Sequence, residues 1–317
     1  MAAGDTITQS LADSLDTVVA SARQIREYEG VMPNLVDKVT LSEGTGTSWR
    51  EISMAALSAQ NITETTTLDN PQQMSDTVFS ITPTVTGIQT LVTDRVASRI
   101  NSQSYAQLGS LAQQAIQRKK DEDGLTVLDG ATTSLSGAGT TLASGVIAAA
   151  AYRISSNATE PGNPPYRCVL HGFQIKDLYD ELTASIGTGT AGDGGEVSDG
   201  LTARVFTEGF RGKIAGVEVF EDGNITIDGS DDAKGGVFAQ EAIVMVQGRA
   251  PRTATVRRED IGGGATVVYL YDEYAYGERS SGNWLFEIYS DKTIFIYFSS
   301  YSIGFRHIVT ITDKYLF

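Results

Sequence analysis

The chain has 317 residues, of which 41% are hydrophobic, and its formal net charge is -15. This length supports about two domains of ordinary size, and the charge argues against a broad, sequence-independent grip on nucleic acid, which needs clustered lysine and arginine. No apolar run reaches the ~18 residues that a membrane-spanning helix needs, and the single cysteine, Cys168, excludes an intrachain disulfide.

The first predicted element is an amphipathic helix within residues 5–27, because its apolar residues repeat at helical spacing. The next segment, residues 38–92, is rich in threonine and has no lysine or arginine between Arg50 and Arg95. Its alternation at residues 77–87 has the period of a strand, so we expect a long two-sided β-excursion. With few apolar residues of its own, this arm should lie against another surface.

A long helix is expected next, in residues 104–124, with Ser104 and Gln107 as a capping box and Gly124 as its end. The acidic residues that precede Gly124 then lie at a helix end. A connection rich in glycine, serine, threonine and alanine leads to a short helix at residues 146–154 and a linker at residues 157–165.

The second half of the chain mixes helical and strand patterns. We expect one helix at residues 174–182 and strands at residues 166–171, 215–222 and 241–248, and the chain beyond residue 265 is aromatic and strand-like.

The sequence GTGTAG at residues 187–192 matches the G-x-G-x-x-G pattern of nucleotide-binding enzymes. In those enzymes a strand enters the glycines and a helix follows, whereas here a predicted helix runs into them and no apolar run follows. The motif therefore indicates a flexible surface loop.

Other chemical motifs are equally weak. Cys168 and His171 are three apart on a predicted strand, so they point to opposite faces and cannot easily share a metal. The acidic stretch at residues 222–229 faintly resembles a calcium loop, but Ile227 replaces the glycine of its sixth position. The basic cluster at residues 251–260 is mixed in sign, which favours an intersubunit ion-pair patch over a nucleic-acid site. We expect no catalytic residue, cofactor or metal.

Four sequence motifs follow one another along the chain: QIREYEGVMPNLV at residues 24–36, LAQQAIQRKKDEDGLTVLDG at 111–130, CVLHGFQIKDLYDEL at 168–182 and GKIAGVEVFEDGNI at 212–225. In the residues of these motifs and in their order, the sequence resembles the major capsid proteins of tailed double-stranded-DNA bacteriophages. The resemblance spans roughly residues 7–290.

The resemblance implies an α+β fold, the bacteriophage capsid (Johnson) fold. Its parts would be an N-terminal arm, an extended loop, a peripheral domain with a spine helix, an axial domain, further peripheral strands and a strand-rich C-terminal extension, at residues 1–37, 38–92, 93–150, 151–247, 248–292 and 293–317. The extension would either add strands to the chain's own sheet or reach a neighbouring subunit.

The implied function is a structural, non-enzymatic one: a virion shell of many copies, arranged as hexamers and pentamers and assembled in the bacterial host cytoplasm. The shell would enclose DNA without sequence-specific binding or any membrane. Its partners would be a portal, a separate scaffolding protein and, in some shells, a decoration protein. An encapsulin-type nanocompartment shell and a β-rich phage tail or surface protein are the alternatives.

The resemblance also implies that the extended loop overlaps a neighbour. We expect intersubunit contacts between acidic and basic side chains, the former on the loop and the latter on or near the long helix: Arg50, Glu51, Glu64, Asp69, Asp76, Arg95, Arg99, Arg118, Lys119 and Lys120. No lysine lies between Lys38 and Lys119, so lysine-to-asparagine cross-links through the loop are not expected. The family pattern begins close to Met1, so no large N-terminal scaffolding segment is expected either.

Overall fold

The computed structural model describes residues 28, 30–44, 46–65, 72–98, 102–187, 212–230, 232–261, 263–280 and 282–291, without the side chains of 102–108 and 182–187. Three predictions lie outside this part of the chain: the N-terminal helix within 5–27, the glycine-rich loop after residue 187, and the strands of the C-terminal extension. The side chains of the predicted capping box, Ser104 and Gln107, are also outside it, and the helix that contains them begins at Ser102, before Ser104.

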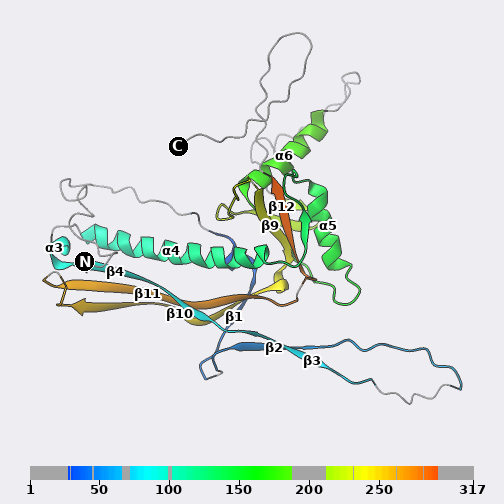
Figure 1. Cartoon of the computed structure of the whole chain (residues 1–317), viewed down its shortest axis with the longest axis horizontal. Helices are drawn as coiled ribbons and strands as arrows, with labels where there is room; N and C mark the ends of the chain where they lie inside the picture. Colours follow the sequence, from blue (N-terminus) through cyan, green and yellow to red (C-terminus); the bar gives the residue numbers. More distant parts are fainter. Residues whose placement is uncertain are drawn as a thin grey trace, which may run out of the picture.

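A long four-stranded sheet forms one half of the molecule, with one helix lying along it (Figure 1). Its strand order is β1-β10-β11-β4, with β1 parallel to β10 and the other neighbours antiparallel. The elements are β1 (Asp37–Thr40), β4 (Thr84–Thr93), β10 (Ile243–Arg258), β11 (Ala265–Glu278) and the helices α2 (Met32–Leu35), α3 (Asp94–Ala97) and α4 (Ser102–Asp129).

The predicted long helix is present as α4, but the prediction that Gly124 ends it is wrong. The helix continues to Asp129, so the acidic cluster Asp121, Glu122 and Asp123 lies within the helix and not at its end. A β-carbon on Gly124 would lie 2.9 Å from Cβ of Met32, so this glycine provides room for α2 to pack on α4.

A six-stranded sheet forms the other half, in the order β5-β12-β9-β6-β8-β7, with α5 and α6 beside it (Figure 1). The predicted helices at 146–154 and 174–182 and the strands at 166–171 and 215–222 are confirmed. The elements are β5 (Ser134–Ser136), α5 (Ser144–Ser155), β6 (Tyr166–Leu170), α6 (Gly172–Gly187), β7 (Lys213–Ile214), β8 (Val217–Glu221), β9 (Asp232–Ala239), η2 (Gln240–Ala242) and β12 (Leu285–Asp291).

The largest hydrophobic core lies under this second sheet and reaches the C-terminal end of α4. Leu128 of α4, Ile147 of α5, Phe238 of β9 and Leu285 of β12 are all fully buried within it. Strand β12 pairs with β9 and β5, so residues 285–291 belong to this sheet rather than to the long one.

The threonine-rich segment divides between two structures. Strands β1 and β4 at its ends join the four-stranded sheet, while β2 (Trp49–Met54) and β3 (Asp76–Ile81) form a separate two-stranded sheet and, among the described strands, pair only with each other. This two-stranded hairpin leads away from the rest of the molecule (Figure 1).

Candidate assembly surface

The β2–β3 hairpin is the most exposed part of the described structure. Its antiparallel register runs from Trp49 opposite Ile81 to Met54 opposite Asp76. Beyond the strands the two arms stay connected, since Ala55 N donates to Ser75 O at 2.9 Å and Ser58 N donates to Gln72 Oε1 at 2.8 Å. The hairpin therefore extends the two-stranded arrangement well past its last ladder pair.

Large apolar side chains follow the exposed hairpin. Ile52 and Val78 face each other across the strands, and they are 60% and 58% exposed. A row of exposed apolar residues on a single projecting arm marks an interaction surface. The hairpin apolar row consists of Ile52, Met54, Leu57, Ile62, Met74 and Val78.

Arg279 anchors the base of the hairpin through three acceptors. Its guanidinium donates to Glu51 Oε2 at 2.7 Å, to Asp37 Oδ2 at 3.0 Å and to the carbonyl of Glu241 at 2.8 Å. The same group lies 6.0 Å from the ring centroid of Trp49. One side chain thus ties β2 to β1 and to η2, which fixes the direction in which the hairpin leaves the sheet.

Apolar packing supports the same base. The rings of Trp49 and Phe79 meet edge to face at 6.1 Å, beside the buried residue Ile81. A β-carbon on Gly277 would lie 2.7 Å from Cδ1 of Ile81, so glycine is required where β11 passes beneath β3. These contacts leave the base of the hairpin rigid and its far part uncovered.

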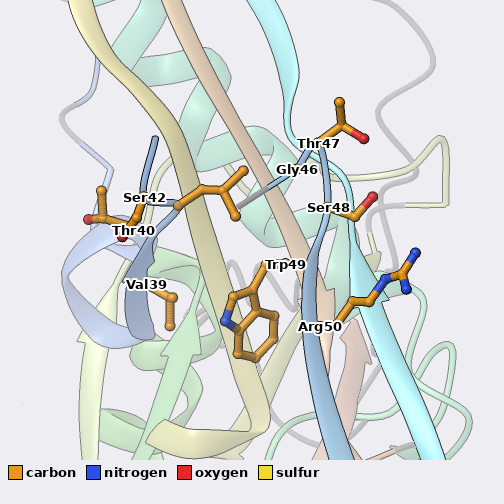
Figure 2. A pocket seen from close by; sticks show the side chains of 9 residues that line it. Val39, Thr40, Ser42, Gly46, Thr47, Ser48, Trp49 and Arg50 are labelled. Carbon is orange, nitrogen blue, oxygen red and sulfur yellow. The ribbon is translucent and has the colours of Figure 1, made fainter. Parts of the chain in front are cut away.

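A groove of about 550 Å³ separates β1 from β2 (Figure 2). Val39 and Trp49 line it from its two sides, and Arg50 stands at its rim. Gly44 and Gly46, with φ of +84° and +99°, adopt the left-handed conformation in the turn that opens the groove.

The acidic residues predicted to contact a neighbour have different roles. Glu51 is held by Arg279 within its own chain. Glu64 and Asp76 are exposed on the hairpin, and Asp69 lies outside the described residues.

The basic residues that were predicted to contact these acidic residues of a neighbouring copy are mostly paired within their own chain. Arg118 forms an ion pair with Glu122 at 2.8 Å, and Lys119 pairs with Asp123. Lys120 is only 5% exposed and pairs with Asp272 at 2.6 Å, so its predicted contact with a neighbour does not fit its position. Arg95 is exposed on α3, and Arg99 lies outside the described residues.

Arg249, on the exposed part of β10, was not predicted, whereas Arg252 belongs to the basic cluster at residues 251–260 that was expected to form an intersubunit ion-pair patch. Arg249 and Arg252 are exposed where β10 extends past the end of β1, and Arg252 lies 5.3 Å from the ring centroid of Tyr271. Two other arginines of this cluster form ion pairs within the chain: Arg257 with Asp94 and Glu259, and Arg258 with Asp260.

The chemically reactive residues have structural roles. Cys168 is fully buried in β6, and burial raises the pKa of its thiol above the ordinary range. His171 follows β6 and stacks on Phe173 at 5.1 Å. Within the described ranges, no group of three or more histidine, cysteine, aspartate or glutamate residues could hold a metal ion. No described helix is both long and apolar enough to cross a membrane.

Solved structures of phage capsids align with this fold over most of the chain. The structure titled "Capsid structure of the Cyanophage P-SCSP1u" aligns with a TM-score of 0.65 and 12% identity, over 89% of this chain and 94% of the other. The cyanophage Pam1 capsid aligns with a TM-score of 0.64 and 10% identity, over 92% and 99%. A chain from Mycobacterium phage Che8 gives 0.68 and 16%, over 87% and 96%.

These alignments show that the chain has the fold of phage capsid proteins, with mixed helix and sheet. They cover about nine tenths of this chain and nearly the whole length of the other chains. No family model matches the sequence. No curated protein matches it.

Proposed function

We propose that this chain is the major capsid protein of a tailed double-stranded-DNA bacteriophage and that it assembles, as hexamers and pentamers, into an icosahedral shell. The observation that carries the proposal is the fold, which is shared with phage capsid structures over about nine tenths of each chain. The role is structural rather than catalytic. Portal, scaffolding and decoration proteins are the proposed partners, and the assembled shell encloses DNA in the host cytoplasm.

Within this proposal the parts of the chain receive names. Helix α4 is the spine helix, the four-stranded sheet is the core of the peripheral domain, and the β2–β3 hairpin is the extended loop. The six-stranded sheet with α5 and α6 is the axial domain, and β12 belongs to it by its pairing with β9.

The hairpin apolar row supplies the free energy of the contact in this proposal. Burying one large aliphatic side chain stabilises a complex by ~1.5–3 kcal/mol. Several such side chains provide on the order of 10 kcal/mol, which offsets a substantial part of the entropy lost on association. In this proposal the row therefore contributes a large share of the contact with a neighbouring copy of the chain, together with other contacts.

Charge sets the orientation of that contact. Glu64 and Asp76 are exposed on the hairpin, and Arg249 and Arg252 are exposed on the four-stranded sheet. Opposite charges of this kind contribute orientation and association rate more than affinity. We expect the acidic hairpin of one copy to face these arginines of the next.

A single substitution tests the role of the hairpin. Ile52→Asp places a charge in the apolar row, while Ser53→Asp places the same charge on the opposite face of the same strand. Both positions are exposed, so both variants should fold. Expressed alone and examined by light scattering and negative-stain electron microscopy, the native chain and Ser53→Asp should form shells or capsomer rings, and Ile52→Asp should remain unassembled.

Equal assembly of the two variants would contradict the role of the row. A native chain that stays monomeric even with its scaffolding protein would contradict the capsid proposal itself. Shells that enclose a cargo enzyme instead of nucleic acid would identify a nanocompartment.

A further inference from the structure

The segment that precedes β1 is docked onto α4 and onto the loop after β8. Tyr28 places its ring against Gly223, and its hydroxyl donates to the carbonyl of Glu221 at 3.0 Å. Four residues later, Met32 is fully buried against Gly124. These contacts hold Tyr28 and Met32 against α4 and the loop after β8.

Two buried carboxyl groups make the polar contacts of this docking. Asp121 of α4 accepts the backbone N–H of Met32 at 2.9 Å and the side-chain amide of Asn224 at 2.8 Å. Asp222 accepts the backbone N–H of Val31 at 3.2 Å and that of Asn224 at 2.9 Å. Both aspartates are fully buried.

Gly30 passes directly over one of these groups. A β-carbon at this position would lie 1.8 Å from Cγ of Asp121, which no side chain can tolerate without displacement of the segment. The backbone of residues 30–32 is therefore in contact with the carboxyl group.

The surroundings of the two carboxyl groups are acidic. Asp121 and Asp222 accept hydrogen bonds from the consecutive amides of residues 32 and 31 and both bind Asn224, so the two carboxyl groups lie beside each other. Two neighbouring carboxyl groups in a buried site favour a state in which they share one proton. The other titratable groups nearby are Glu221, Tyr28 and Tyr276. In the part of the chain that the structure covers, neither aspartate forms an ion pair with a lysine or arginine. Two ionised carboxylates at this position would repel each other in a buried site.

We propose that Asp121 and Asp222 form a proton-dependent latch, which holds residues 28–35 on α4 while the pair shares a proton and loosens when that proton is lost. The latch would control how firmly the N-terminal segment is attached to the rest of the subunit. This inference does not depend on the proposed capsid function, because it concerns a contact within one chain.

Titration of Asp222 sets the direction of the effect. Burial, together with the neighbouring Asp121, raises the pKa of Asp222 from 3.8 to about 7. The latched state therefore binds more protons than the released state between these two values. By linkage, the latch is strongest below pH 4, weakens by up to about tenfold per pH unit as the pH rises toward 7, and is weakest above 7.

Hydrogen exchange reads the latch directly, because Val31 and Met32 donate their amide hydrogens to the two carboxyl groups. The experiment measures the peptide spanning residues 28–36 in the full chain at pH 5 and pH 8, as protection factors corrected for the intrinsic pH dependence of exchange. Light scattering at both pH values checks that the oligomeric state is unchanged. We expect at least tenfold lower protection at pH 8.

Three variants separate the latch from general stability. Asp222→Asn should keep the protection at pH 8, because an amide can donate to Asp121 without ionising. Gly30→Ala should lower protection at both pH values. Asp177→Asn changes another buried carboxyl group, on α6, and should leave the pH dependence of residues 28–36 as in the native chain.

Equal protection of the native chain at pH 5 and pH 8 would overturn the proposal, and this measurement needs no variant. An undiminished pH dependence in a folded Asp222→Asn protein would overturn it as well.

Discussion

At the scale of single residues, the pair of Lys120 and Asp272 is a buried polar link between α4 and the four-stranded sheet. Both side chains are buried, and Gln247 also donates to Asp272 at 2.5 Å. The neighbouring Lys119 is half exposed and pairs along the helix with Asp123. Two adjacent lysines therefore have very different environments.

This difference predicts two different losses of stability. Lys120→Met leaves Asp272 as an unpaired buried charge, which costs ~3–5 kcal/mol. Lys119→Met removes an exposed pair and should cost less than about 1 kcal/mol. Urea unfolding of the two variants measures the free energies, and similar values for both would show that the buried pair is not an anchor.

At the scale of elements, α4 shows how tertiary packing overrides a local signal. Glycine inside a helix is unfavourable by ~1 kcal/mol relative to alanine, so its presence at position 124 suggests a helix end. The helix continues because α2 packs against this glycine, and Met32 occupies the space that a side chain would need. Only the three-dimensional structure reveals that requirement.

The two glycines of α4 should respond oppositely to alanine. A β-carbon on Gly109 would meet no atom of another element within 4 Å, so Gly109→Ala should stabilise the protein by up to ~1 kcal/mol. Gly124→Ala forces Met32 to move and should destabilise it by ~1–3 kcal/mol. The melting temperatures of both variants test this prediction. A higher melting temperature for Gly124→Ala would show that Met32 can move away from position 124 at little cost.

The sequence predicted elements better than it predicted their partners. Alternation and helical spacing identified most helices and strands, including the excursion that contains the hairpin. The parallel pairing of β1 with residues 244–247 joins segments that are far apart in the chain, and no local pattern reports it. The outer part of β10 contains Pro251 and four arginines, which are tolerated because it is a sheet edge. Long sequence separation also explains the wrong expectation for Lys120. The sequence alone suggests a surface position for this lysine, because its partner Asp272 is distant in the chain.

At the scale of the whole molecule, the absence of lysine between Lys38 and Lys119 limits how copies can be joined. The hairpin cannot donate a lysine amine to an isopeptide bond. We expect boiling in denaturant to release monomers from assembled shells, seen as a single band near 34 kDa by gel electrophoresis. Ladders of multimers that survive boiling would contradict this expectation.

The net charge of -15 also acts at this scale. Copies of an acidic chain repel one another, and salt screens that repulsion over a Debye length of ~8–10 Å at ordinary ionic strength. Apolar contacts such as those of the hairpin are not weakened by screening, so moderate salt should favour assembly.

The hairpin carries its own chemical reporter. Met54 and Met74 are 70% and 64% exposed, and both belong to the apolar row. A thioether that peroxide can reach is converted to the sulfoxide, which adds an oxygen that mass spectrometry detects. In the free chain both methionines would oxidise readily, and a neighbouring copy that covers them would slow the reaction. The progress of assembly could thus be followed without any attached label.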